Sequence, residues 1–264
     1  MYEFTYHRAG SLEDAKVKFG QGEDPTLMGG GMTLIPTMKQ RLAMPTDIID
    51  LGGVAELAGV RMEGDLLVIG AITNHDTVAN SADVKNAIPA LAELAGLIGD
   101  PMVRNRGTIG GSIANSDPAA DYPAGLVGLG ATVVTSDREI PADEFFTGMF
   151  ETALEPGEII REVRFPKAKR AAYAKFPNPA SRYAVVGVFV AEAPDGVRVA
   201  VTGAAPSVFR HAEMEQALAG NFSVDAISGM KGNPEEMNSD IHASAEYRAH
   251  LVGVMARRAV ASIA

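Results

Sequence analysis

Two short glycine-rich segments are the part of this sequence best suited to hold a ligand. The first glycine segment, residues 29–33, reads Gly-Gly-Gly-Met-Thr and follows a short apolar stretch typical of a buried strand end. The second glycine segment, residues 108–112, reads Thr-Ile-Gly-Gly-Ser. Glycine lets a bulky anion approach main-chain N–H groups, and the hydroxyls add donors. Either segment alone could be a tight turn, but together they suggest one large ligand, such as a dinucleotide gripped at its pyrophosphate.

Neither glycine segment matches the fingerprint of a Rossmann dinucleotide site. Met32, Thr33 and Leu34 stand where that fingerprint needs its third glycine. The glycines of residues 126–131 precede a strand instead of following one, which favours close helix packing as their role.

Charged side chains flank the second glycine segment. Asp117, before Pro118, is typical of a helix cap, whereas Asp121 has no such simple explanation and could accept hydrogen bonds from ribityl or ribose hydroxyls. Arg104 and Arg106 could pair with phosphate or tether the loop to surface carboxylates. The sequence leaves these two roles for the arginines open.

Composition excludes several classes of function. The formal net charge of -10 disfavours binding to nucleic acid or to an anionic membrane surface. The chain has no cysteine, which removes disulfides, thiolate catalysis and cysteine-ligated iron-sulfur clusters, and its five histidines show no metal-ligand spacing. No signal sequence or membrane span is recognisable, so a cytoplasmic location is expected. Redox work would therefore need an organic cofactor.

The pattern of apolar residues predicts mixed helices and strands in two or three lobes. Helices are expected at 11–19, 88–98 and 244–262, and strands at 47–51, 65–71, 131–136 and 158–165. Residues 182–193 and 197–205 read as an antiparallel hairpin joined at Pro194, Asp195 and Gly196. In the last helix, Leu251 and Met255 lie on the apolar face and Arg248 mostly off it. The hairpin marks a separate C-terminal lobe.

Two long motifs resemble a known family. They are MGGGMTLIPTMKQRLAMP (28–45) and GDPMVRNRGTIGGSIANSDPAADYPA (99–124), with further similarity in GAAPSVFR (203–210) and SAEYRAHLVGVMARRAV (244–260). The chain resembles the flavoprotein (medium) subunits of molybdenum hydroxylases, most closely the carbon monoxide dehydrogenase branch of the xanthine dehydrogenase type. The similarity extends over almost the whole chain.

The resemblance implies an α+β fold in two domains. Residues 1–168 would form a two-lobed FAD-binding domain of the vanillyl-alcohol-oxidase (PCMH) type, with lobes at about 1–55 and 56–168. Residues 169–264 would form a smaller α+β domain with an antiparallel sheet, like the C-terminal domain of the carbon monoxide dehydrogenase flavoprotein. The implied partners are a molybdopterin-containing large subunit and a small subunit with two [2Fe-2S] clusters, in a dimer of heterotrimers. A chain without cysteine suits that division of labour.

The resemblance also implies which residues contact FAD. Ser112 stands where many relatives have asparagine, Asp121 aligns with an FAD-binding aspartate, and Ile160 and Lys175 correspond to positions beside the isoalloxazine ring. A core strand residue and a solvated lysine are the alternatives for Ile160 and Lys175, and Tyr183 is a further candidate to cover the flavin. The implied FAD-binding residues are Leu27, Met28, Gly29, Gly30, Gly31, Met32, Thr33, Leu34, Ile98, Gly99, Thr108, Ile109, Gly110, Gly111, Ser112, Asp121, Ile160 and Lys175.

The implied function is electron transfer. The family subunit takes electrons from [2Fe-2S] clusters of a partner and passes them through FAD to a terminal acceptor, so no residue is assigned as a catalytic acid, base or nucleophile. The alternatives are a free-standing flavin-dependent oxidoreductase on the same fold and an assembly module that has lost FAD. The substrate of the complex is open, and so is the acceptor, which could be a quinone, oxygen or NAD.

Overall fold

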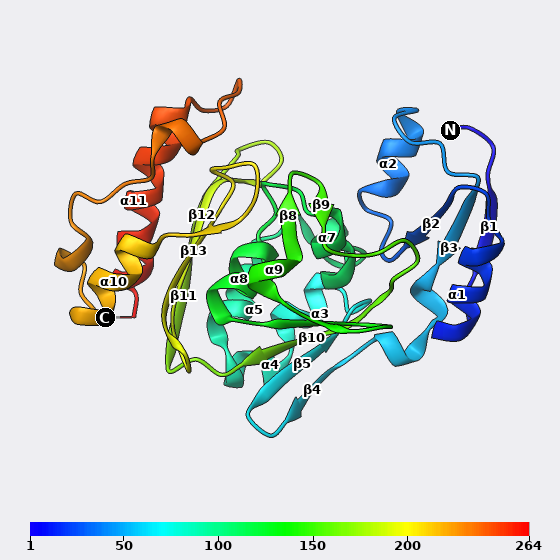
Figure 1. Ribbon diagram of the computed structural model, residues 1–264, viewed down its shortest axis with the longest axis horizontal. Coiled ribbons are helices and arrows are strands. Elements are labelled where there is room, and N and C mark those ends of the chain that lie inside the picture. Colours follow the sequence, from blue (N-terminus) through cyan, green and yellow to red (C-terminus); the bar gives the residue numbers. More distant parts are fainter. Residues whose placement is uncertain (264) are drawn as a thin grey trace.

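The N-terminal lobe is a small parallel sheet with a helix in each connection (Figure 1). β1 (Thr5–Arg8) and β2 (Pro25–Met28) both pair with the central β3 (Asp47–Asp50), and parallel strands require crossovers. The crossovers are α1 (Leu12–Gln21) and α2 (Leu34–Lys39). The computed structural model, which describes residues 1–263, confirms the predicted helix at 11–19: Ser11 caps it by accepting a hydrogen bond from the N–H of Asp14. The sequence did not predict β1 or α2.

The second lobe is a five-stranded antiparallel sheet in the order β4-β5-β10-β6-β7. Its strands are β4 (Val60–Glu63), β5 (Leu66–Gly70), β6 (Thr132–Thr135), β7 (Glu139–Pro141) and β10 (Ile160–Pro166). The strands predicted at 65–71, 131–136 and 158–165 are confirmed. A two-stranded ribbon, β8 (Phe146–Gly148) and β9 (Glu151–Thr152), follows the short helix α9 (Ala142–Phe145).

A set of short helices packs beside this sheet and carries the second glycine segment. The helices are α3 (His75–Asn80), α4 (Ala82–Ala87), α5 (Pro89–Gly96), α6 (Pro101–Arg104), α7 (Ile109–Asn115) and α8 (Tyr122–Leu129). The predicted helix at 88–98 is confirmed as α5. The glycines of residues 126–131 do serve packing, because a Cβ on Gly128 would lie 2.7 Å from the ring of Phe189 in the C-terminal domain.

The C-terminal domain is an antiparallel sheet covered by helices, which confirms the α+β class. Its strands are β11 (Arg170–Pro177), β12 (Ala184–Ala193), β13 (Gly196–Thr202) and β14 (Phe209–Arg210), and its helices are α10 (Ala212–Gly220) and α11 (Ala245–Ala261). The predicted hairpin is present, with Ala193 opposite Gly196. The placement of Arg248 off the packed face of the last helix was wrong: Arg248 is buried and donates to the carbonyls of Val185 and Gly203. The buried guanidinium also pairs with the Asp240 carboxylate at 2.6 Å.

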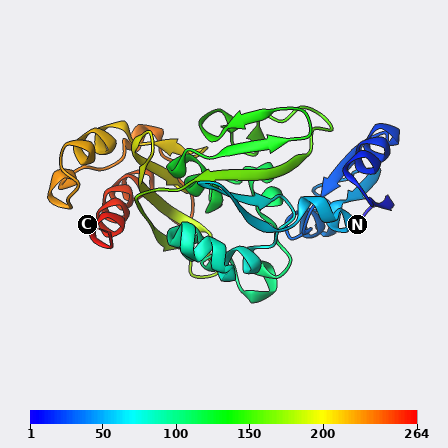
Figure 2. The same cartoon turned by 90° about the horizontal axis from the view of Figure 1, so that it is seen from below.

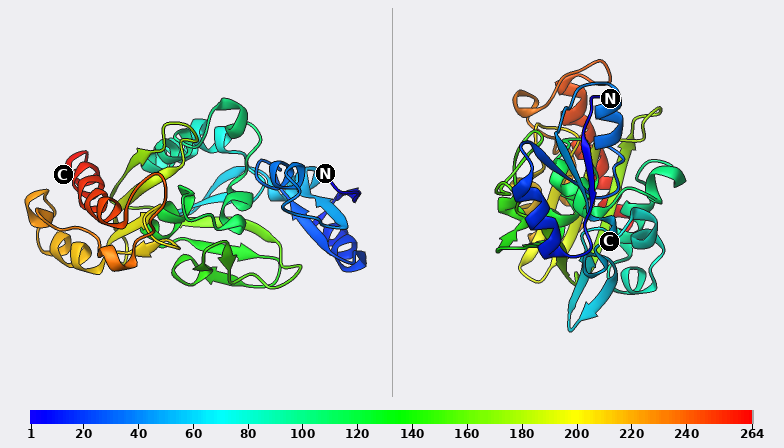
Figure 3. Two further views of the ribbon diagram at one scale, coloured as in Figure 1. Left: turned by 90° about the horizontal axis from the view of Figure 1, so that it is seen from above. Right: turned by 90° about the vertical axis from the view of Figure 1, so that its right-hand side faces the viewer.

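The three parts follow one another along an elongated molecule (Figures 2 and 3). The N-terminal lobe lies at one end, α10 and α11 lie at the other, and the five-stranded sheet stands between them. Short 3-10 turns complete the connections at Leu51–Gly53, Ala55–Leu57, Asp225–Ile227 and Pro234–Glu236. Among the described residues, no helix has the length and apolar character needed to cross a membrane.

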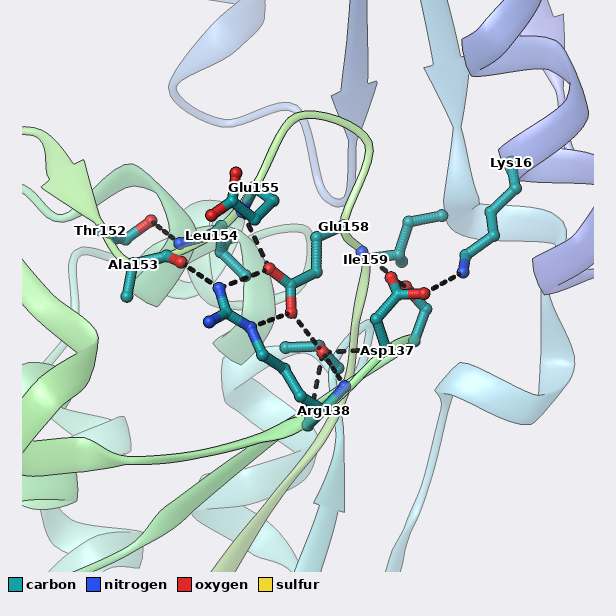
Figure 4. A network of polar contacts seen from close by, with 11 residues as sticks. Lys16, Asp137, Arg138, Thr152, Ala153, Leu154, Glu155, Glu158 and Ile159 are labelled. Atoms are coloured by element: carbon teal, nitrogen blue, oxygen red, sulfur yellow. Dashed lines mark hydrogen bonds and ion pairs between the residues drawn. The ribbon is translucent and has the colours of Figure 1, made fainter.

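A polar network in the second lobe is joined to the N-terminal lobe by one ion pair (Figure 4). Glu158 is buried and accepts hydrogen bonds from the Thr135 hydroxyl at 2.6 Å and from the Arg138 guanidinium at 3.0 and 3.1 Å. Burial acts to raise the pKa of Glu158, but these bonds and a backbone N–H outweigh it and leave that pKa below its usual value. Lys16 of α1 reaches Asp137 in the same turn, at 2.8 Å. The buried part of the network thus stabilises the turn that Lys16 contacts.

Candidate functional site

The two glycine segments meet across a cavity of about 530 Å³. The N-terminal lobe contributes residues 26–34, the second lobe contributes the loops on either side of α6 and α7, and the C-terminal domain contributes Ser181, Arg182 and Tyr183 at one part of the wall. All three parts of the chain therefore build one site. Of the FAD-binding residues implied by the sequence, these line the cavity: Leu27, Met28, Gly29, Gly30, Gly31, Met32, Thr33, Leu34, Ile98, Gly99, Thr108, Gly111, Ser112 and Asp121.

The first glycine segment needs glycine because it lies directly against the second. A Cβ on Gly30 would fall 1.9 Å from the carbonyl oxygen of Arg106, and one on Gly29 would fall 2.7 Å from the Thr108 hydroxyl. Gly31 has φ +73°, a left-handed conformation that favours glycine. The triple glycine thus permits both the close approach of two loops and the turn into α2.

The first glycine segment also offers unused hydrogen-bond donors. Within residues 1–263, the backbone N–H groups of residues 29–33 have no hydrogen-bond acceptor, although every one of these residues lines the cavity. Main-chain N–H groups in folded proteins are nearly always paired, with protein, water or ligand. Successive N–H groups in a concave turn are suited to bind an anion.

The second glycine segment is built differently. The N–H groups after Thr108 are already bonded: Ile109 to the Thr73 carbonyl at 3.1 Å, Gly110 to the Ala71 carbonyl at 2.8 Å, and Gly111 to the Thr108 hydroxyl, which caps α7, at 3.1 Å. Ile109 is fully buried, and neither it nor Gly110 lines the cavity. The hydroxyls of Thr108 and Ser112, with the N–H of Thr108, are therefore what this segment offers to a ligand.

Asp121 lies in the cavity wall and is held from behind by the C-terminal domain. Its carboxylate accepts a hydrogen bond from the Tyr173 hydroxyl at 2.5 Å and pairs with the Lys175 ammonium at 2.9 Å. Burial raises the pKa of Asp121, while Lys175 and Tyr173 act to lower it. Lys175 is not a solvated lysine, because only 3% of its side chain is exposed and it also donates to the Leu97 carbonyl. It supports Asp121 without lining the cavity.

Ile160 also does not line the cavity. It is buried in β10 within the main hydrophobic core of the second lobe. Ile160 therefore occupies a core position of the strand, and its contact with the flavin ring stays a prediction.

The loop of residues 117–120 is fastened to the C-terminal sheet. The N–H of Gly203 donates to the Pro118 carbonyl at 2.7 Å, and the Thr202 hydroxyl donates to the Ala120 carbonyl at 2.6 Å. The helix cap predicted at Asp117 was wrong: its carboxylate accepts from the N–H of Ala119 and closes a local turn, because the next helix begins only at Tyr122. Burial raises the pKa of Asp117, which lines the cavity.

Two residues of the cavity wall carry no signal in the local sequence. His75 and Arg182 line the cavity, and the Arg182 guanidinium donates to the Gly99 carbonyl at 3.1 Å. Arg104 donates to the carbonyls of Ile98 and Gly99, both at 3.0 Å, and so tethers the loop. Within residues 1–263 its partners are backbone carbonyls and not the surface carboxylates that the sequence suggested. Tyr183, with 43% of its surface exposed, lies in the wall as well. Only packing between distant segments brings His75 and Arg182 to the cavity.

The cavity does not resemble a metal centre. Among the described residues, no three His, Cys, Asp or Glu side chains are grouped so that they could hold a metal ion. Its titratable wall residues are instead His75, Asp117, Asp121 and Tyr183.

Comparison with known proteins identifies close relatives over the whole chain. A family model described as the FAD binding domain in molybdopterin dehydrogenase matches residues 2–168, and one described as the CO dehydrogenase flavoprotein C-terminal domain matches residues 171–263. The chain is 36% identical to the carbon monoxide dehydrogenase medium chain of Hydrogenophaga pseudoflava, over 97% of this chain and 96% of that one. It is 35% identical to the nicotine 6-hydroxylase medium subunit of Paenarthrobacter nicotinovorans, over 97% and 95%.

A solved structure shares the fold. The carbon monoxide dehydrogenase from Hydrogenophaga pseudoflava contains a chain that superposes with a TM-score of 0.89 and 37% identity, covering 98% of this chain and 96% of that one. The arrangement of two lobes and a C-terminal domain is therefore that of a known structure.

Proposed function

Because this chain belongs to the family of FAD-binding flavoprotein subunits of molybdenum hydroxylases, we propose that it carries electrons from the [2Fe-2S] clusters of a partner subunit to a terminal acceptor. It is an oxidoreductase subunit that binds FAD. When bound, FAD supplies the ability to collect single electrons from the clusters and to release them to the acceptor. The partners proposed are a molybdopterin-containing large subunit and an iron-sulfur small subunit, assembled as a dimer of heterotrimers.

The observation that carries the proposal is the row of free N–H groups at residues 29–33 in the cavity wall. A cofactor with a pyrophosphate supplies the anion that such a row would bind. The hydroxyls of Thr108 and Ser112 would add donors from the opposite segment, and the carboxylates of Asp117 and Asp121 would accept hydrogen bonds from ribityl or ribose hydroxyls. Tyr183 offers an aromatic face at the wall. The residues present thus fit FAD.

The composition supports a partner chain as the source of electrons. The sequence has no cysteine, so [2Fe-2S] clusters of the cysteine-ligated kind must be held elsewhere. Substrate choice is proposed to lie in the molybdenum-containing partner, because the relatives are named for chemically unrelated substrates: carbon monoxide, nicotine and glyceraldehyde.

A first experiment tests FAD binding by the chain itself. The chain is expressed, any bound ligand is released with acid, and the ligand is identified by its absorbance and mass. We expect FAD near one per chain. A Gly30→Val, Gly111→Val double variant should lose it, while Gly20→Ala, in open space on α1, should keep it. A folded wild-type chain that takes up no added FAD would contradict the proposal.

A second experiment tests electron transfer. The chain is co-expressed with its large and small partners, the mass of the complex is measured, and flavin absorbance is followed in stopped flow after substrate is added without an acceptor. We expect the clusters and then the flavin to be reduced. In a complex stripped of FAD, the clusters should still be reduced but the acceptor should not. An unchanged rate of acceptor reduction in the stripped complex would refute the electron-transfer role.

A further inference from the structure

His75 is a buried histidine in the cavity wall whose ring is unused by the contacts described above. Only 4% of the residue is exposed, and it begins α3, where its backbone N–H donates to the Gly107 carbonyl at 3.0 Å. Neither ring nitrogen has a hydrogen-bond partner within residues 1–263, and Nδ1 is completely enclosed. Buried polar atoms are normally paired, so an unpaired one beside a ligand cavity needs a reason.

The surroundings of the ring are specific. On one side, the ring of Tyr122 lies with its centroid 5.4 Å from that of His75, and the Tyr122 hydroxyl is also buried without a partner among the described residues. On another side, the Nε2 atom lies against Gly107, where a Cβ would come within 2.5 Å of it. Gly107 lines the same cavity. Glycine at this position therefore makes the room that Nε2 occupies.

The protonation of the two groups follows from their environment. Burial, followed by the positive charge of Arg104, lowers the pKa of His75 to about 4, so the ring is neutral at pH 7 and has one donor and one acceptor nitrogen. Burial, followed by the charge of Asp121, raises the pKa of Tyr122, so its hydroxyl keeps its proton and can donate. The Tyr122 hydroxyl and Nδ1 are thus a matching donor and acceptor, although they do not bond one another in this structure. Their pairing would leave the ring proton on Nε2.

We propose that His75 is an FAD-binding residue whose Nε2–H donates a hydrogen bond to an oxygen of FAD beside the second glycine segment. Tyr122 is a positioning residue, which in the FAD-bound chain would donate to Nδ1 and so fix the tautomer. Phosphate, ribityl and flavin carbonyl oxygens are all acceptors of the required kind. The inference rests on the FAD site proposed above and adds to it a side-chain donor from α3, beside the segment in which most N–H groups are already bonded.

A matched pair of substitutions tests the role of Nε2. An asparagine amide reaches about as far as Nδ1, and a glutamine amide about as far as Nε2, so His75→Gln retains a donor at the required position and His75→Asn loses it. We expect His75→Asn to weaken FAD binding roughly ten- to a hundredfold, the range for a hydrogen bond to a charged or strongly polar acceptor. His75→Gln should stay within about threefold of wild type. His250→Phe is the control, since His250 stacks on Tyr247 in the C-terminal domain.

The tautomer gives a second readout that does not depend on any variant. Nitrogen-15 spectra of the histidine-labelled wild-type chain, recorded with and without FAD at pH 7, should show His75 protonated on Nε2 when FAD is bound. Binding is measured by titration of the FAD-free chain with FAD. His75→Asn that binds FAD as tightly as wild type, or a bound form protonated on Nδ1, would overturn the inference. If the wild-type chain itself binds no FAD, the proposed function fails as well, which separates the two failures.

Discussion

The close contact between the two glycine segments predicts a strong effect of adding one methyl group at Gly30. The Cβ of Gly30→Ala would lie 1.9 Å from the Arg106 carbonyl oxygen and 2.6 Å from its carbon, whereas real Cβ contacts are essentially never below 3.0 Å. The obstacle is backbone, so the segments must separate by more than ~1 Å because no side chain can rotate away. Overpacking of this kind costs ~1–3 kcal/mol, and we expect the upper end, which lowers the melting temperature by roughly 6–12 °C.

The same separation should impair the cavity, because Gly30 lines it and the free N–H groups of residues 29–33 would move. We expect FAD to bind at least about tenfold more weakly, equal to ~1.4 kcal/mol. Thermal unfolding of the FAD-free chain and calorimetric titration with FAD measure the two effects separately. Gly20→Ala is the control: nothing lies within 4 Å of its Cβ, and alanine in helix α1 should stabilise by ~0.5–1 kcal/mol. A Gly30→Ala chain that melts and binds FAD like wild type would refute this reasoning.

Four further predictions follow from buried polar groups. The pKa of His75 is near 4 in the folded chain and ordinarily ~6.5, so as the pH falls the unfolded chain binds a proton before the folded chain does. The free energy of unfolding should therefore fall by up to roughly 3 kcal/mol between pH 6.5 and 4. The pKa values of Asp117 and Asp121 are raised, so these groups make the free energy of unfolding change with pH in the opposite direction. The measurement is therefore the difference in free energy of unfolding between wild type and His75→Gln, from urea unfolding at each pH. Lys175→Met should lower the free energy of unfolding by ~3–5 kcal/mol, because it leaves the Asp121 carboxylate buried without its cation. Adding Asp121→Asn should restore part of that loss. Equal losses in the single and double variants would contradict this prediction. Arg138→Ala should cost ~1–3 kcal/mol by leaving Glu158 partly unpaired, seen in chemical unfolding, with the exposed, distant Arg258→Ala expected to change little. Thr202→Val removes the hydrogen bond from the Thr202 hydroxyl to the Ala120 carbonyl, so it should lower the free energy of unfolding by ~1 kcal/mol and weaken FAD binding by loosening the loop of residues 117–120. An unchanged titration with FAD would show that this hydrogen bond does not position the site.

The sequence could predict the glycine segments because the constraint that shapes them is local. Glycine is needed wherever a loop approaches another backbone or takes a left-handed turn, as at Gly30 and Gly31, and that need is visible in the residue type. The apolar strands and the Pro194–Asp195 turn were predictable for the same reason. The short, half-exposed β1 has no such pattern, and its place in the sheet is fixed only by its pairing with β3.

The partners of the buried polar groups could not be predicted, because they come from distant parts of the chain. Tyr173 and Lys175 lie 52 and 54 residues beyond Asp121, in a different domain. His75 reaches the second glycine segment through a bridge between Asn74 and Thr108, which no local pattern announces. The bonded state of the N–H groups at Ile109 and Gly110 likewise depends on carbonyls near the end of β5. A motif can therefore indicate that a segment binds a ligand without showing which of its atoms are free to do so.

The C-terminal domain takes part in the proposed FAD site as well as covering the second lobe. It supplies Tyr173 and Lys175 behind Asp121, it holds the loop of residues 117–120 through Thr202, and it contributes Arg182 to the cavity wall. The cavity thus exists only when the N-terminal lobe, the second lobe and this domain are packed together. A ligand that binds only the packed state stabilises every contact on which that state depends. If FAD binds in this cavity as proposed, its binding is coupled to the docking of the C-terminal domain. A substitution at the domain junction can then lower FAD affinity without touching the cofactor.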